Sequence, residues 1–189
     1  MSDPSVRRVT DVASLKAVAH PLRVRLLGAL RMEGPATASE LGRRFGESSG
    51  ATSYHLRQLA RYGFIEEDAE QTNARDRRWR AVHRYTSWQE SDFADHPEGR
   101  EATRALRERQ RAYTSRVAEQ FEDADWGREW LGVAGQHDDI VRLTPGALRE
   151  LTEKINTTIR EYAARAADTP GAEQVAIFYS AFPIRGYPE

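Results

Sequence analysis

Apolar residues recur at helical spacing through the first sixth of the chain. The spacing predicts a first helix from Asp11 to Ala19, with Thr10 as its cap. A second helix is predicted to open at His20-Pro21, where proline at the first helical position costs no hydrogen bond. It ends at Gly34-Pro35. The apolar positions of the two segments are Val12, Leu15, Val18, Leu22, Leu26, Leu27 and Leu30.

A capping box begins the next predicted helix. The Thr37 hydroxyl is placed to cap it, and Glu40, three residues on, to reach back to the Thr37 amide. Gly46 supplies a tight turn, and a helix over residues 48–62 follows, capped by a serine at its start. Two short helices joined at a glycine turn, after a longer one, are typical of a helix-turn-helix core.

The pattern changes from helical spacing to alternation after Gly63. Phe64–Glu67 and Arg77–Val82 are predicted to be strands, joined by the polar segment Asp68–Asp76. Such a hairpin after a helix-turn-helix is a wing. The alternation places Trp79 and Ala81 on one face of the second strand and Arg78 and Arg80 on the other.

The second half of the chain has two long amphipathic segments. Residues 98–125 predict a helix with a narrow apolar stripe, which on so long a helix needs a partner. Residues 145–167 predict another helix, and residues 139–143 and 174–183 read as strands. The stripe consists of Ala102, Leu106, Tyr113, Val117 and Phe121, and the second helix is expected to bury Leu148, Leu151, Ile155, Ile159 and Tyr162.

Charge divides the chain at about the same place as the pattern. Residues 1–85 hold 15 Lys and Arg against 10 Asp and Glu, net +5, whereas residues 86–189 hold 13 against 19, net −6. We therefore expect a mainly α fold with small β (α+β), with a nucleic-acid-binding domain in residues 1–85 and a dimerisation and effector region in residues 86–189. No secretory signal or membrane span is visible, which predicts a cytoplasmic protein.

Two motifs carry a resemblance to a known family. The sequence from His20 to Leu27, followed by Ser53-Tyr54-His55-Leu56-Arg57-Gln58-Leu59 and then Gly63-Phe64-Ile65, resembles the winged-helix domain of ArsR-like bacterial transcriptional regulators. The resemblance covers residues 11–85. It implies that the helix of residues 48–62 enters the major groove of double-stranded DNA and that the wing lies on the backbone.

Helical spacing independently points several side chains of residues 48–62 away from the core. Those near the helix start are placed to reach base edges, and arginines are placed to hold phosphate or guanine. A solvated helix face is the alternative for any one of them, and His55 is as well explained by packing as by contact with DNA. The candidate DNA-binding residues are Ser49, Gly50, Ser53, Tyr54, His55, Arg57 and Arg61 on the helix, and Arg75, Arg77, Arg78 and Arg80 on the wing.

Other chemistry has less support in the sequence. The chain has no cysteine, so the thiolate motif of the family's metal-sensing members has no counterpart, and we predict no metal or cofactor. The run His137-Asp138-Asp139 reads as a polar loop rather than a metal site. Enzyme motifs are absent, and the protein is not expected to be an enzyme. Trp88, Tyr113, Trp126, Trp130 and Phe178 are candidates to line a pocket for an unknown small-molecule effector, although core packing explains them equally well.

These inferences predict a homodimeric, sequence-specific transcriptional regulator. Repression is favoured over activation because a bound dimer occludes a promoter. The dimer is expected to be held by the helix of residues 98–125, assisted by the first helix; the alternative is that this helix folds back on residues 145–167 within one chain. Two other functions remain open. One is a winged-helix module that binds protein, and the other is a ligand-binding C-terminal domain with an accessory winged helix.

Overall fold

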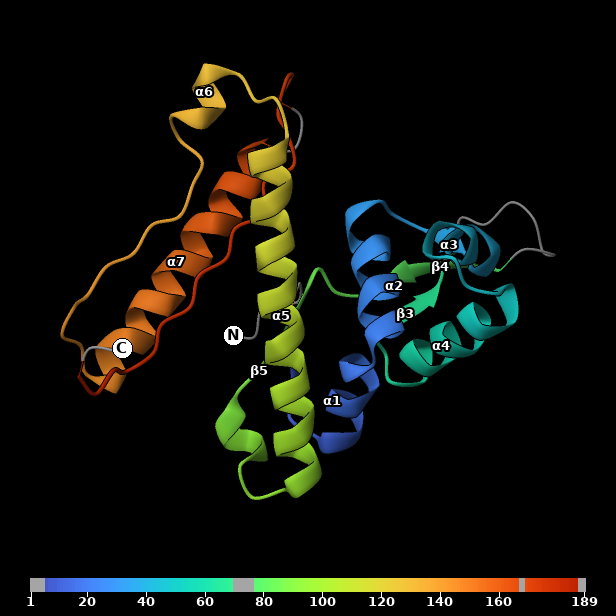
Figure 1. Cartoon of the computed structure of the whole chain (residues 1–189). Coiled ribbons are helices and arrows are strands. Elements are labelled where there is room, and N and C mark those ends of the chain that lie inside the picture. The colour runs from blue at the N-terminus through green and yellow to red at the C-terminus, as the bar shows by residue number, and fades with distance from the viewer. Residues whose placement is uncertain (1–5, 70–76, 167–168, 187–189) are drawn as a thin grey trace. The chain divides into compact units, whose positions relative to one another are not determined.

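The computed structural model describes residues 6–69, 77–166 and 169–186, which divide into two compact units. Unit 1 is Met1–Tyr113 and unit 2 is Thr114–Glu189, so the division falls inside the long helix α5 (Pro97–Asp123; Figure 1). The functional boundary that the sequence suggests near residue 85 stays a prediction.

Four helices of unit 1 form the core of its fold. They are α1 (Val12–Ala19), α2 (Pro21–Met32), α3 (Ala38–Phe45) and α4 (Ser49–Arg61). Their bounds agree closely with the ranges expected from the apolar spacing. The mainly α fold with small sheets is confirmed, and α3 and α4 pack on each other as the two helices of a helix-turn-helix.

Side chains cap each of these helices at its start. The Asp11 carboxylate accepts from the Ser14 amide at 2.7 Å, so Asp11 caps α1 and the prediction of Thr10 was wrong by one residue. The longer reach of a carboxylate from an extended residue satisfies the free amide of the first turn. The capping box of Thr37 and Glu40 is present as predicted.

The turn between α3 and α4 depends on a glycine that the sequence pattern does not single out. A Cβ on Gly42 would lie 2.9 Å from the Glu47 carbonyl oxygen and 3.2 Å from the Thr52 hydroxyl. That hydroxyl is buried and donates to the Ser48 carbonyl at 2.9 Å. The two helices therefore approach as closely as they do because residue 42 has no side chain.

The wing is confirmed as an antiparallel sheet of three strands. Its order is β2 (Ala36–Thr37), β4 (Arg78–Ala81) and β3 (Ile65–Glu67). Ile65 pairs with Ala81 and Glu66 with Arg80. Strand β2 was not expected from the sequence, because two residues are too short a run to show alternation.

A second, parallel sheet joins β1 (Val6–Val9) to β5 (Tyr85–Trp88). It brings the start of the described chain next to the segment that follows the wing. The Arg31 guanidinium donates from Nε to the His83 carbonyl at 2.9 Å and from Nη2 to the Thr86 hydroxyl at 2.7 Å. Burial lowers the pKa of Arg31 to about 10. These contacts fix β5 against α2.

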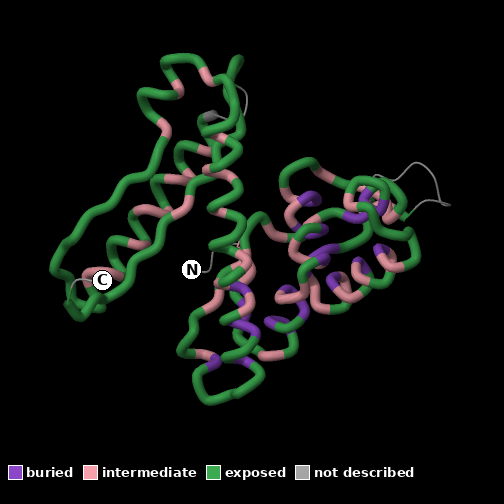
Figure 2. Tube along the Cα trace, in the orientation of Figure 1, coloured by how far each residue is buried: buried purple, intermediate pink, exposed green. Residues whose placement is uncertain are grey.

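The apolar core of unit 1 extends into the first half of α5. Ala102 and Leu106 are buried together with Phe93 of the short 3-10 helix η1 (Glu90–Phe93). In Figure 2 the buried residues follow the helices of unit 1 and this part of α5. The prediction that the α5 stripe as a whole faces a partner was therefore wrong for Ala102 and Leu106, whose partner is the core of their own chain.

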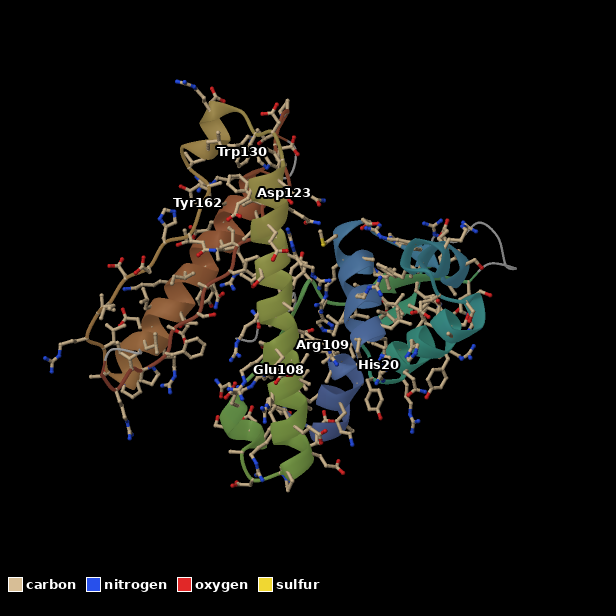
Figure 3. The ribbon with its side chains drawn as sticks, in the orientation of Figure 1. His20, Glu108, Arg109, Asp123, Trp130 and Tyr162 are labelled. Atoms are coloured by element: carbon tan, nitrogen blue, oxygen red, sulfur yellow. The ribbon has the colours of Figure 1, made fainter. Side chains whose placement is uncertain are left out.

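Unit 2 contains α6 (Arg128–Leu131) and α7 (Pro145–Ala166). None of its described residues is buried, so the expected burial of Leu148, Leu151, Ile155, Ile159 and Tyr162 within one chain is not found. Leu151 and Tyr162 are 40% and 63% exposed. Figure 3 shows Tyr162 on α7.

The two strands predicted in the second half are wrong. The described residues 139–143 and 174–183 contain no strand and pair with no other segment. Their Val, Ile, Phe and Tyr content suits a strand, but backbone hydrogen bonding in a sheet requires a neighbouring strand, and neither segment has one. Within the described ranges no helix is long and apolar enough to cross a membrane.

Candidate nucleic-acid interface

Helix α4 presents a polar face opposite its buried residues. Leu56, Leu59 and Thr52 are fully buried. Ser49, Gly50, Tyr54, Arg57 and Arg61 are exposed, Tyr54 by 54%, and Ser53 is half-buried. The structure thus puts these candidates on the outward face that the spacing predicts. Gly50 has open space where a Cβ would lie, so no described residue requires a glycine there.

A shallow hollow of about 470 Å³ lies between the starts of α3 and α4 and the wing. It joins three candidates from α4, Ser49, Ser53 and Arg57, to Arg77 of the wing. Hydroxyls and guanidinium groups around a concave surface at two helix starts suit a phosphate, because both helix dipoles place partial positive charge there. The lining residues are Thr37, Ala38, Ser39, Ser49, Ser53, Arg57, Arg77 and Trp79.

Thr37 and Ser39 are residues of this surface that the sequence reasoning did not select. Thr37 was assigned only a capping role, and Ser39 had none. Their position was a usable signal, because Thr37 immediately precedes α3, Ser39 is its second residue, and the first helix of a helix-turn-helix crosses the DNA backbone.

Arg57 is the arginine of α4 best placed to contact a partner. It is exposed and makes no hydrogen bond or ion pair with any described residue. Arg61 is exposed one turn later, with its guanidinium 5.9 Å from the Tyr62 ring centre. Arg57 therefore gives up no contact with the described residues on meeting phosphate or guanine.

The wing arginines have partners within the protein. Arg77 pairs with Glu67 at 3.2 Å and Arg80 pairs with Glu66 at 2.5 Å, all four side chains being about half exposed. Arg78 is half-buried and donates to the Pro35 carbonyl, which ties β4 to the segment before α3. Arg75 lies outside the described residues.

His55 packs against another histidine. Its ring centre lies 4.3 Å from that of His20, at an interplanar angle of 32°, and Tyr54 meets it edge-on at 5.2 Å. Burial lowers the pKa of both histidines, and the neighbouring Arg23 lowers them further. His20 Nδ1 also accepts from the Leu22 amide at 3.3 Å at the start of α2. This geometry assigns His55 a packing role between α2 and α4.

Two other groups of candidates lie elsewhere. Trp126, Trp130 and Phe178 line a hollow in unit 2, but Trp88 and Tyr113 do not contribute to it. Trp88 instead belongs to β5 and packs against the core of unit 1. Across residues 6–69, 77–166 and 169–186 no three His, Asp or Glu side chains gather as a metal site would need.

Comparison with known proteins identifies a helix-turn-helix domain from the sequence. Residues 18–68 match the family model described as "Helix-turn-helix domain". No curated protein matches the chain. Among solved structures, an ArsR family transcriptional regulator is 23% identical over 60% of this chain and 91% of its own, with a TM-score of 0.32.

Two further solved structures are similar at lower identity. The transcriptional regulator Tm0710 from Thermotoga maritima is 14% identical, with 82% of this chain and 89% of its own covered and a TM-score of 0.33. A MarR family regulator from Neisseria meningitidis is 13% identical, with 79% and 80% covered and a TM-score of 0.31. These TM-scores establish no common arrangement, so the identification depends on the match over residues 18–68. That segment is a helix-turn-helix domain, and with its β3–β4 hairpin it is a winged helix that resembles those of ArsR-like regulators.

Proposed function

We propose that the protein is a sequence-specific transcriptional regulator that binds double-stranded DNA through α4. The observation that carries the proposal is the outward face of α4, which offers several hydroxyls and an arginine without a partner among the described residues, within a helix-turn-helix domain. In this arrangement α4 enters the major groove, with Ser53 and Arg57 at base edges. The starts of α3 and α4 lie against phosphates.

The wing contributes affinity rather than sequence information. Arg77 and Arg80 reach the backbone beside the groove only by sharing or leaving Glu67 and Glu66. Arg78 holds the wing in place through Pro35 and is secondary as a DNA contact. Arg75 stays a candidate for a backbone contact.

The regulator acts as a homodimer, held by its C-terminal region, and represses by occluding a promoter. Unit 2 supports this role because its described residues leave apolar side chains of α7, such as Leu151, without a core. A second copy would cover them. Two α4 helices spaced about 34–36 Å apart would then read the two halves of a near-palindrome.

Selection of bound duplexes from a random DNA pool tests the whole proposal. We expect an enriched near-palindrome whose affinity falls steeply with salt, since neutralised phosphates release counterions. Arg57→Ala should cost about 1–3 kcal/mol and relax preference at one base position of each half-site. Arg116→Ala, which removes an exposed arginine of α5 instead, is the matched control and should leave binding unchanged.

Other results would redirect the proposal. If Arg57→Ala lowers the affinity for all DNA sequences equally, Arg57 contacts a phosphate and not a base. Failure to enrich any duplex, with no salt-dependent affinity, would favour a winged-helix module that binds protein.

A further inference from the structure

Unit 2 contains a hollow of about 560 Å³, within the range of small-molecule sites. Three segments of unit 2 form its walls: the last part of α5, residues 126–136 with α6, and residues 173–178. Figure 3 shows Trp130 on α6, at the end of the unit where α5 finishes near Asp123. None of the residues that line the hollow belongs to the surface proposed for DNA.

Aromatic rings dominate the walls of this hollow. Phe121 and Trp126 are stacked, with ring centres 6.0 Å apart at 25°, and Trp130 meets Trp126 at 6.0 Å and 62°. Val117 and Phe178 add further apolar surface. Faces of aromatic rings open to a cavity bind flat apolar molecules and attract cations through their quadrupole.

One polar group of a residue that lines the hollow lacks a partner. The indole Nε1 of Trp126 is buried and makes no hydrogen bond with any residue of the described chain. An indole nitrogen only donates, and leaving it unpaired costs free energy. A ligand in the hollow whose acceptor reaches this nitrogen would recover that cost.

The charge of the lining selects the sign of a ligand. Glu122 and Glu173 are the charged residues that line the hollow, and the described lining includes no lysine, arginine or histidine. Two carboxylates beside aromatic faces favour a cation and disfavour an anion.

We propose that the hollow of unit 2 binds a small planar aromatic cation that carries a hydrogen-bond acceptor. Its ring lies against Trp126 and Trp130, its acceptor receives the hydrogen bond of the Trp126 indole, and its charge faces Glu122 and Glu173. Binding of this ligand does not require DNA, so the proposed ligand site can be tested independently of the proposed DNA binding.

Two dyes with the same xanthene ring and opposite charge provide the test. Rhodamine 6G is a cation with an ester carbonyl as acceptor, and fluorescein is an anion at neutral pH. Titrating the full chain without DNA, followed by dye anisotropy and tryptophan quenching, should show saturable binding of rhodamine 6G. Fluorescein should bind at least about tenfold more weakly, which corresponds to about 1.4 kcal/mol.

Variants of the lining locate the site. Glu122→Gln with Glu173→Gln should weaken rhodamine 6G about tenfold and narrow its advantage over fluorescein. Glu119→Gln with Glu129→Gln, which removes two exposed acids of α5 and α6 outside the lining, is the matched control and should have no effect. Trp126→Phe should weaken the dye while leaving the far-UV circular dichroism unchanged.

Three results would overturn the proposal. Equal binding of the two dyes would mark a non-selective apolar surface. Unchanged rhodamine 6G affinity in the double glutamine variant would place any binding elsewhere. Tryptophan emission that shifts with protein concentration, in the absence of any dye binding, would mean that a second copy of the chain covers the hollow.

Discussion

Both units of the molecule contain amphipathic helices, but the apolar faces of these helices are buried in unit 1 and remain partly exposed in unit 2. In unit 1, Leu56 and Leu59 of α4 are fully buried against the other helices and the wing. In unit 2, Ile155 and Ile159 of α7 are only half-buried, and no described residue of that unit is buried. Apolar spacing establishes that a face exists, whereas the fold determines whether the same chain covers it. Unit 1 is thus complete in one chain, and unit 2 has surface left for a partner or a ligand.

Truncation of one leucine in unit 1 and one isoleucine in unit 2 would sharpen this comparison most. We expect Leu56→Ala to lower the free energy of unfolding by about 2–5 kcal/mol at every protein concentration, because it leaves a cavity in a closed core. Ile155→Ala should have an effect that grows with protein concentration, because this side chain contributes through the proposed dimer. Denaturant unfolding at several concentrations, combined with light scattering, measures both.

An equal, concentration-independent loss in the two variants would break the comparison. It would mean that α7 has a closed core of its own. A light-scattering mass that stays monomeric at all concentrations would remove the dimer from the proposed function.

Acidification should act on unit 1 through its stacked histidines. The pKa of His20 and of His55 lies below the usual 6.5 because burial disfavours the charged form, and Arg23 adds repulsion to both. Arg109 of α5 also faces His20 and lowers its pKa. The unfolded chain therefore binds protons more readily than the folded chain. The contribution of the two histidines to the free energy of unfolding is complete above about pH 6.5 and is lost as the pH falls from there through their lowered pKa values. Protonation also removes the acceptor that His20 offers to the amide of Leu22.

Thermal unfolding between pH 7.5 and pH 5.5 tests this expectation. His20→Asn keeps a side chain that caps helices well and removes one titrating ring, so the melting temperature should depend less on pH. His96→Asn changes an exposed histidine just before α5 and serves as the control. Asp11 and Glu40, whose pKa values are lowered from an already acidic value, titrate below this window. Parallel pH curves for His20→Asn and the wild type would contradict the prediction.

The sequence predicted those parts of the fold that local chemistry determines. The capping box at Thr37 and the alternation around Trp79 identified α3 and the wing, because both signals lie within a few residues. The parallel pairing of β1 with β5 was missed, because the strands are four residues long and about eighty residues apart. No local pattern could have shown that Leu106 is buried by its own chain while the later part of the same helix is not.

The candidate interface was predictable in the same way, residue by residue. Helical spacing was enough to place Arg57 on the outward face of α4. The pairing of Arg80 with Glu66 needed the register of the hairpin, which puts these residues directly opposite each other. The sequence shows Glu66 and Glu67 but does not show which arginines they pair with. The wing therefore appeared more basic from the sequence than its surface is.

The smallest effect on stability is expected in the wing. Its charged side chains are exposed, so they can be replaced without changing the buried core of unit 1. Glu66→Gln with Glu67→Gln releases Arg80 and Arg77 from their partners. Exposed ion pairs contribute about 0.2–1 kcal/mol each, so stability should change little. The freed arginines, and the loss of two negative charges near DNA phosphates, should raise affinity for duplex DNA about two- to fivefold and steepen its dependence on salt. Glu33→Gln, which releases Arg44 of α3 from an exposed ion pair, is a control for charge away from the wing. Unchanged affinity and an unchanged salt slope in the double variant would mean that Arg77 and Arg80 stay clear of the DNA, leaving recognition to the helix-turn-helix alone.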